Sequence, residues 1–430
     1  MAGLSLAITF PFALGVPGGG TLDCIETARH LRAAGARVLA LPVLAYGHGR
    51  FPRPPVPPEH RGDAQERLLR ASMVEVLGIP PHPLHYLLDG LAVRRTLARA
   101  MRAHSVDAVL SYWQEATYLP RFLRERDVLF CMIAAAPYKL WFGDGHLDLP
   151  PRVGPRPRAT PRGMARRFLY PVVRKHVLGP ARRYKARLVV GNSLRAADLV
   201  LARSRSAGAE VVDLFQVEED RIAVAYCGVD PAFAAVPRQP RPRIERILYS
   251  GALTRDKGIF DAIDALGAAA ARGRGHWTLR VAGWGDEAAV RDAARARGVE
   301  RQVTLLGRLD RDGLLEQLAW ADVALQPSRA ESFGLAVAEA QAAGLPVVAY
   351  EAGAVPEVVV HGRTGWLTPV GDTGRLSVAL ETVMADAERC RTMGLAGRAR
   401  TTDRFTWSES AAAMLRAIDH ALAGRSQNRR

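Results

Sequence analysis

LQPSRAESFGLAVAEAQAAGLPVVAYEAGAVPE, residues 325–357, contains the end of one apolar strand, a short helix and a second apolar strand. The run Val323–Gln326 predicts the first strand, and Gly334–Ala343 predicts the helix. A Gly-Leu-Pro sequence ends this helix, and Val347–Tyr350 predicts the next strand. Strands and helices that alternate in this way are typical of βαβ units, so the stretch predicts a parallel sheet with its sites at the carboxyl ends of the strands.

The loop before this helix combines two carboxylates with free backbone amides. The amides of Phe333, Gly334 and Leu335 lie at a helix N-terminus, which attracts anions such as phosphate. Glu331 and Glu339 are eight positions apart, or about 12 Å if all were helical, which is comparable to the span from the ribose to the far sugar of a nucleotide sugar. The other interpretation is an ordinary helix of an α/β domain, in which the glutamates only support helix propensity and the helix dipole.

Length and composition fit an intracellular enzyme of about two domains. The chain has 430 residues, of which 48% are apolar. Its four cysteines form no C-x-x-C pair and no metal-ligand spacing, so we expect neither disulfides nor zinc. The apolar run Leu4–Leu14 has no basic leader and predicts a first strand rather than a signal peptide, and no stretch is long enough to cross a bilayer.

The net charge of +16 and the pI of 10.4 are unusually high. Part of the charge lies between Arg152 and Arg187, a segment with many Arg and Lys residues, interleaved apolar residues and no Asp or Glu. This composition suits an anionic membrane surface, where each basic residue adds about 1 kcal/mol. A solvated Arg-rich loop is an equal alternative, since prolines exclude a continuous helix through the first half of the segment. Nucleic acid fits less well, because the segment has no clear recognition helix.

Two alternating units predict two Rossmann-like domains. The predicted boundaries are residues 1–236 for the first domain, 237–246 for a Pro- and Arg-rich linker, 247–407 for the second domain and 408–430 for a C-terminal helix that returns to the first domain. In the first unit we expect a helix over Leu22–Ala34 after the glycine loop. Further along we expect a strand at Leu188–Val190 and a helix at Ser193–Arg203.

Several motifs in one order resemble the retaining nucleotide-sugar glycosyltransferases of family 4, group 1, which include sucrose synthase and bacterial mannosyltransferases of lipid and polysaccharide assembly. The matching motifs in the second domain are GALTRDKG (251–258), VAGWGDE (281–287), VTLLGRL (303–309), ADVALQPSRAESFGLAVAEAQAAGLPVVA (321–349) and HGRTGWL (361–367). CGVDPAF (227–233) and FTW (405–407) match further family motifs. The resemblance implies the fold called GT-B, an α/β architecture in which two facing Rossmann-like domains enclose a cleft.

The resemblance also implies roles for individual residues. Glu331 would contact hydroxyls of the donor sugar, Glu339 would contact the ribose, and the amides at 333–335 would contact the sugar and the diphosphate. Lys257 would stabilise the leaving diphosphate. The first-domain glycines would approach the phosphates from the opposite side; these are Gly18, Gly19 and Gly20. The first domain would hold the acceptor and the second the donor, and closure of the two domains would assemble the site.

Two departures from the family pattern affect these roles. Relatives commonly carry Arg directly after the glycine at position 251, whereas this chain has Ala252, and Arg255 from the same loop is the candidate replacement. Relatives often carry a His after the strand that corresponds to Val128–Ala134. This chain has Ala135–Lys139 there, and His146 lies too far along the loop to be assigned. The acceptor-side residue is therefore open.

A metal is not implied by the resemblance. Asp310-Arg311-Asp312 forms an Asp-x-Asp triplet, which holds a divalent cation in a different glycosyltransferase fold. Here the triplet precedes a predicted helix, so we expect it to provide an N-cap. Cationic side chains and helix ends would then stabilise the diphosphate, and no cofactor is expected.

The predicted function is transfer of a sugar, with retention of configuration, from a nucleotide diphosphate sugar to an acceptor hydroxyl. The basic surface favours a glycan or lipid-linked acceptor of the cell envelope, and a cytoplasmic protein associated with the inner face of the membrane. A second hypothesis is a GT-B epimerase or phosphorylase that uses the same cleft, although no motif for a pyridoxal lysine is evident. A third is a basic binding protein without activity, which the presence of Glu331, Glu339 and Lys257 argues against.

Overall fold

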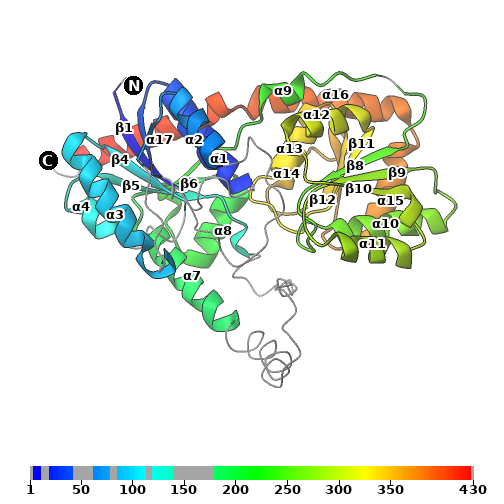
Figure 1. Cartoon of the computed structure of the whole chain (residues 1–430), viewed down its shortest axis with the longest axis horizontal. Helices are drawn as coiled ribbons and strands as arrows, with labels where there is room; N and C mark the ends of the chain where they lie inside the picture. The colour runs from blue at the N-terminus through cyan, green and yellow to red at the C-terminus, as the bar shows by residue number, and fades with distance from the viewer. Residues whose placement is uncertain are drawn as a thin grey trace.

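Two parallel β-sheets, each covered by helices, form two domains that lie side by side (Figure 1). The computed structural model describes residues 3–10, 19–41, 62–77, 85–112, 119–139, 179–239 and 241–427. The sheets have seven and six strands among these residues. This arrangement confirms the predicted fold class of two Rossmann-like domains.

The first sheet has the strand order β3-β2-β1-β4-β5-β6-β7, and every neighbouring pair is parallel. Its strands are β1 (Ser5–Thr9), β2 (Arg37–Leu41), β3 (Glu75–Val76), β4 (Ala108–Ser111), β5 (Leu129–Ala134), β6 (Leu199–Ala202) and β7 (Ile222–Val224). Its helices are α1 (Gly19–Ala33), α2 (Gly62–Ala71), α3 (His85–Ala103), α4 (Pro120–Arg124), α7 (Gly179–Ala196) and α8 (Arg205–Phe215). The chain crosses toward the second domain through α9 (Pro231–Ala234).

Strand β5 shows why both faces of this sheet are covered. Its residues alternate between two apolar cores, with Leu129, Cys131 and Ile133 in one and Phe130 and Met132 in the other. All six of its residues are buried. Successive side chains of a strand point to opposite faces, so a strand with no polar face needs helices on both sides of its sheet.

The second sheet has the order β10-β9-β8-β11-β12-β13 and is also parallel throughout. Its strands are β8 (Arg246–Ser250), β9 (Thr278–Ala282), β10 (Val303–Gly307), β11 (Val323–Gln326), β12 (Val347–Tyr350) and β13 (Gly365–Thr368). Its helices are α10 (Ile259–Ala271), α11 (Glu287–Ala296), α12 (Arg311–Trp320), α13 (Leu335–Ala342), α14 (Val355–Val358), α15 (Thr373–Met384) and α16 (Ala387–Arg404).

The last helix, α17 (Trp407–Gln427), leaves the second domain and packs on the first, where Figure 1 shows it beside α1. Its residues Met414 and Ile418 are fully buried in an apolar core that also contains side chains of β1 and β4. A buried arginine, Arg203, also joins this helix to the domain, because its guanidinium donates to the Ser410 hydroxyl (3.3 Å) and to the Asp23 carboxylate (2.9 Å). The chain therefore connects the two domains twice.

Two sequence expectations for the first domain are wrong, and a third has the right helix with the wrong start. Leu188–Val190 is part of helix α7 rather than a strand, and Ser193–Arg203 contains the end of that helix followed by strand β6. Short apolar runs do not distinguish a buried strand from a buried helix, and the place of β6 between β5 and β7 decides it here. Helix α1 begins at Gly19, before the predicted Leu22, because the glycine loop already contributes its first turn.

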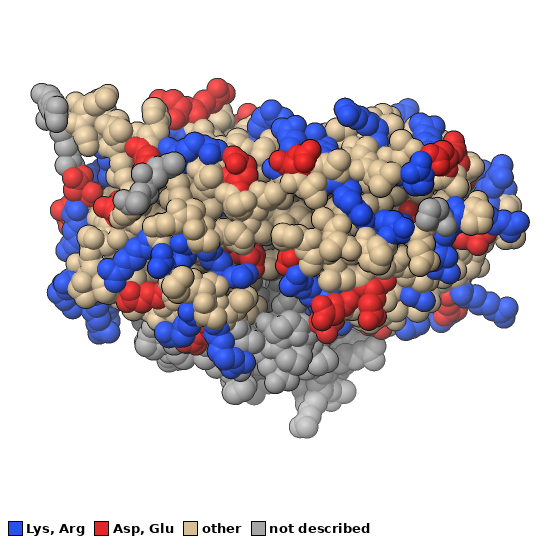
Figure 2. Space-filling view, turned by 90° about the horizontal axis from the view of Figure 1, so that it is seen from above, with Lys and Arg blue, Asp and Glu red and all other residues tan. Residues whose placement is uncertain are grey.

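Some expectations lie outside the described residues. These are Gly18, His146 and most of the basic segment that begins at Arg152. Within the described ranges, no helix is both long and apolar enough to span a bilayer. On the face shown in Figure 2, cationic and anionic side chains are interspersed over both domains rather than gathered into one patch.

Candidate functional site

The backbone of Glu331 is fixed by the loop that follows β12. Its carbonyl oxygen accepts a hydrogen bond from the Ala354 amide (2.9 Å). The neighbouring Gly353 has a φ of 54°, and a Cβ at this position would overlap the same carbonyl oxygen. Only glycine fits both the left-handed backbone and the close approach. The short loop after β11 is therefore held firmly against the loop after β12.

Lys257 and Glu331 form an ion pair across two loops, with 2.7 Å between Nζ and Oε1. The pair is partly accessible, since 34% of the Lys257 side chain and 15% of the Glu331 side chain are exposed. Burial lowers the pKa of Lys257, but the Glu331 carboxylate outweighs this effect, so the net pKa is raised and the amine is charged. The structure thus brings together the two residues predicted to act at the sugar and at the diphosphate.

The loop between β8 and α10 presents Lys257. The Tyr249 hydroxyl lies within hydrogen-bonding distance of the carbonyl oxygens of Ala252 (2.8 Å) and Lys257 (3.1 Å), which ties the two ends of this loop together. Gly258 has a φ of 76°, and a Cβ there would overlap the carbonyl oxygen of Pro327. This contact brings the start of α10 against the loop that leads to Glu331.

The N-terminus of α13 lies directly after Glu331. Gly334 caps the helix with a φ of 92° and has no side chain to occupy the helix end. Within the described residues, no hydrogen-bond acceptor contacts the amides of Phe333, Gly334 and Leu335. These amides and the positive end of the helix dipole are therefore available to an anion.

Glu339 lies one turn further along α13. Burial raises the pKa of its carboxyl from 4.5 to about 8, with a smaller contribution from the negative charge of Asp230. No hydrogen bond from the part of the chain that the structure describes lowers this pKa, so the carboxyl group has no partner there. A partly buried acid with no partner among these residues is unfavourable in its charged form, so hydroxyl groups of a ligand would stabilise it.

The donor-side loop also touches the first domain. The Ser332 hydroxyl, between Glu331 and Phe333, donates to the carbonyl oxygen of Ala135 (2.9 Å) at the carboxyl end of β5. Sequence reasoning gave Ser332 no role, and its only signal was its place between two assigned residues. The contact places the Lys257–Glu331 pair near the edge of the first sheet where ligands of parallel sheets bind.

The remaining predicted site residues are less closely associated with this pair. Arg255 is exposed, and its guanidinium carbon lies 5.3 Å from the ring centroid of Phe260. Gly19 and Gly20 form the first turn of α1. The roles assigned to these residues remain predictions.

Asp310 is an N-cap, as the sequence predicted. Its Oδ1 accepts a hydrogen bond from the Gly313 amide (2.8 Å) at the start of α12. Asp312 lies within the first turn of the same helix. Over the described ranges, no group of three His, Cys, Asp or Glu side chains is arranged to hold a metal ion.

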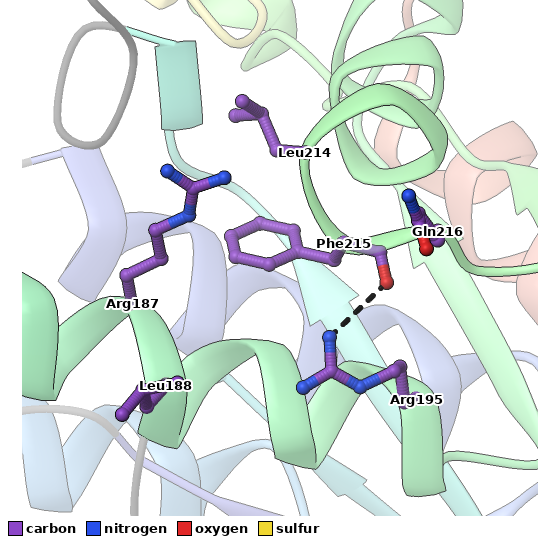
Figure 3. A pocket seen from close by; sticks show the side chains of 6 residues that line it. All are labelled: Arg187, Leu188, Arg195, Leu214, Phe215 and Gln216. Carbon is purple, nitrogen blue, oxygen red and sulfur yellow. Dashed lines mark hydrogen bonds between the residues drawn. The ribbon is translucent and has the colours of Figure 1, made fainter.

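A separate cavity of about 280 Å³ lies between α7 and α8 in the first domain (Figure 3). Its lining combines cationic and apolar side chains: Arg187, Leu188, Arg195, Leu214, Phe215 and Gln216. Arg195 is anchored by a hydrogen bond from Nη1 to the Phe215 carbonyl oxygen (3.3 Å). The cavity does not include the Lys257–Glu331 pair.

Similarity to known proteins extends over the loops that carry Lys257, Glu331 and Glu339. The family model of the group 1 glycosyl transferases matches residues 238–400. The glycogen synthase of Mycobacterium tuberculosis is 35% identical over 238 residues, which cover 54% of this chain and 57% of that protein. The alpha-maltose-1-phosphate synthase of Mycolicibacterium smegmatis is 31% identical over 279 residues, which cover 56% of this chain and 70% of that protein.

Among solved structures, the sucrose-phosphate synthase of Thermosynechococcus elongatus shares the fold with a TM-score of 0.71, at 18% identity and with 98% of this chain and 100% of that chain covered. This likeness extends over both domains, whereas the sequence matches cover little more than half of the chain. Because the family model covers the loops that carry Lys257, Glu331 and Glu339, and because a relative matches over most of its length, the chain belongs to the group 1 glycosyltransferases.

Proposed function

We propose that the protein transfers a sugar from a nucleotide diphosphate sugar to an acceptor hydroxyl, with retention of configuration at the anomeric carbon. The observation that carries this proposal is the Lys257–Glu331 pair beside the free amides of the α13 N-terminus. A diphosphate fits a cation together with amide donors, and sugar hydroxyls fit a carboxylate. Two of the relatives bear the names of carbohydrate synthases, which supports the same chemistry.

Each group has one task in the proposed reaction. Lys257 and the amides at 333–335 stabilise the charge that develops on the diphosphate as its bond to the anomeric carbon breaks. Glu331 accepts hydrogen bonds from donor-sugar hydroxyls, and Glu339 accepts them from the ribose. No enzyme carboxylate is assigned as a nucleophile, so the acceptor oxygen attacks on the face from which the diphosphate leaves. The acceptor proton then passes to an oxygen of the departing diphosphate.

The proposal needs no metal, since Lys257 and the helix amides supply the positive charge at the diphosphate. A different glycosyltransferase fold uses a divalent cation at the diphosphate instead. A chelator distinguishes metal-dependent from metal-independent transfer. We expect turnover of the purified protein to survive an excess of EDTA. Complete loss of turnover that Mg²⁺ or Mn²⁺ restores would contradict the proposal.

The first test is a thermal-shift screen of UDP-, GDP- and ADP-sugars, because a ligand that binds only the folded protein raises its melting temperature. We expect one base to stabilise the wild-type protein and to lose this effect in Lys257→Ala. The matched control is Arg391→Ala, which removes an exposed cation of α16 that pairs with Glu388. NMR of the product then assigns the anomer, and an inverted product or the absence of any stabilising nucleotide sugar would reject the proposal.

We further propose that the acceptor is a glycan or lipid-linked molecule and that the protein binds the inner, anionic face of the cytoplasmic membrane through its first domain. Helix α7 carries basic residues and no acid, and Leu188 on this helix is exposed beside Arg187. The cavity between α7 and α8 has the same mixture of guanidinium and apolar groups. Both features suit an anionic head group with an apolar chain.

Vesicle flotation tests this second part. We expect the protein to float with vesicles that contain phosphatidylglycerol at low salt, and to remain in solution with neutral phosphatidylcholine vesicles. Saturable binding to a nucleic-acid probe with no vesicle binding would favour the nucleic-acid interpretation instead. No binding to anionic vesicles at low salt would reject the membrane proposal without affecting the proposed sugar transfer.

A further inference from the structure

A carboxylate from the second domain caps a helix of the first domain. Glu357 belongs to the short helix α14, and its Oε1 accepts a hydrogen bond from the Ser206 amide (2.8 Å). Its Oε2 accepts from the Arg205 amide (3.1 Å). Arg205 and Ser206 are the first two residues of α8, so their amides have no partner within their own helix.

The charge of Glu357 suits this position. The N-terminus of α8 carries the positive end of the helix dipole, and its own N-cap, Ser204, already accepts from the amide of Ala207. Glu357 therefore satisfies the two amides that Ser204 leaves free. Only 12% of the Glu357 side chain is exposed, so its carboxylate is held largely out of solvent by these contacts.

Glu357 also reaches the segment where the chain passes between the domains. The Tyr226 hydroxyl donates to Glu357 Oε2 (2.8 Å), just after β7 and before the chain enters the second domain. The Tyr226 ring lies 5.4 Å from the ring of Phe405, which directly precedes the second crossing into α17. One carboxylate thus joins the first domain, one crossing segment and the second domain.

The same aromatic cluster leads to the proposed active site. Phe333 lies 6.2 Å from Tyr226 and 5.4 Å from Phe405, measured between ring centroids, and it is buried. Phe333 follows Glu331 and Ser332 in the loop that faces the diphosphate position. The hydrogen bond from Ser332 to Ala135 is a second contact between the domains, formed by this loop itself. These contacts form a continuous path from Glu357 through Tyr226 and Phe333 to this loop.

We propose that Glu357 is a positioning residue, which fixes the angle between the two domains and, through Tyr226 and Phe333, holds the Glu331 loop against the first domain. The part of this inference that concerns turnover rests on the proposed sugar transfer. The part that concerns the domain angle does not. Glu357 lies within the quoted sequence stretch, but it contacts neither the Lys257–Glu331 pair nor the α13 amides, and acts on them only through the aromatic cluster.

The test compares Glu357→Ala and Glu357→Gln with a control, Glu381→Ala. Glu357 forms an ion pair with Arg205 of the first domain, with 3.4 Å between Oε2 and Nε. Glu381 likewise forms an ion pair, but its partner, Arg272, lies in the same domain. Small-angle X-ray scattering reports the domain angle through the radius of gyration. Calorimetry reports the affinity for the nucleoside diphosphate, which by the proposed function binds at Lys257 and the α13 amides, and steady-state kinetics report transfer.

We expect a larger radius of gyration for Glu357→Ala and no change for the control. We expect kcat/KM to fall about tenfold, within the range of known coupling energies, while the affinity for the nucleoside diphosphate stays within about twofold. Glu357→Gln should be intermediate, because its amide oxygen still accepts a hydrogen bond although the charge is lost.

Two results would overturn the inference. One is an unchanged radius of gyration together with an unchanged kcat/KM in Glu357→Ala. The other is an equal fall in nucleotide affinity and kcat/KM, accompanied by a lower melting temperature, which would assign Glu357 to folding alone. If the wild-type protein transfers no sugar, the scattering comparison still decides whether Glu357 sets the domain angle, so the two proposals fail separately.

Discussion

Glu339→Gln tests the physical basis of the proposed ribose site, because the pKa of Glu339 is raised from 4.5 to about 8, mainly by burial. For an acid with a raised pKa, the folded state holds a proton that the unfolded state releases between these two values. The unfolded state therefore binds fewer protons in this window, and the free energy of unfolding falls as the pH rises from about 4.5 to about 8. Glutamine mimics the protonated form and removes this pH dependence.

The size of the effect follows from the pKa values. At about 1.4 kcal/mol per pH unit, a rise from 4.5 to about 8 corresponds to at most about 5 kcal/mol. The Glu339 side chain is only partly buried, so water relieves a large share of this cost, and we expect about 2 kcal/mol. For a domain of this size, about 2 kcal/mol corresponds to a melting-temperature difference of about 4–8 °C.

Differential scanning calorimetry at pH 5 and pH 9 measures this difference. We expect Glu339→Gln to gain stability relative to the wild-type protein on going from pH 5 to pH 9. Glu351→Gln is the matched control, because Glu351 is an exposed carboxylate of the same domain. If the difference between Glu339→Gln and the wild-type protein is the same at both pH values, Glu339 does not hold a proton in the folded state and the reasoning is wrong.

Three further predictions concern the same site. Lys257→Ala and Glu331→Gln should each lower kcat by about 100- to 1,000-fold. The loss in the double variant should be smaller than the product of the two single losses, because the residues form one ion pair. A loss equal to that product would contradict this. Gly258→Ala should lower the free energy of unfolding by about 2 kcal/mol more than Gly273→Ala, and the melting temperatures should follow the same order. Both glycines have a φ of 76°, but only at Gly258 would a Cβ overlap a neighbouring atom. Equal losses would show that backbone strain alone decides. Nucleotide binding at pH 7 should release a proton, because Glu339 ionises when it accepts hydrogen bonds from the ribose hydroxyls. The binding enthalpy should then depend on the ionisation enthalpy of the buffer. A binding enthalpy that is the same in all buffers would contradict the proposed contact.

The second domain was largely predictable from local sequence. Strands β11 and β12 coincide with the predicted runs, since a short apolar segment bounded by glycine or proline has few other structures available. The cap at Asp310 was predictable because a side chain and an amide three residues apart meet at almost any helix start. Local rules were sufficient at these positions because the interacting groups lie within a few residues of one another.

The first domain was less predictable. The apolar run in β6 and the one inside α7 look alike in sequence, and only their neighbours in the folded protein distinguish them. The departures from the family pattern at Ala252 and Ala135 also concern long-range contacts. At Ala135 the structure shows a backbone carbonyl that accepts from Ser332, a contact between residues 197 positions apart.

The sequence by itself determined the two alternating units and the helix after Glu331, because these depend on periodicity and glycine placement. It also supplied the predicted roles of Lys257, Glu331 and Glu339, through motifs that resemble a known family. Only the tertiary structure decided that Lys257 and Glu331 form an ion pair and that Glu357 caps a helix of the other domain. It also decided that Glu339 lies partly buried with no partner among the described residues. These features depend on burial and on long-range contacts. Lys257 and Glu331 are 74 positions apart, and Ser206 and Glu357 are 151 positions apart. The free energy of such contacts is set by the surroundings that folding creates, which no local pattern contains.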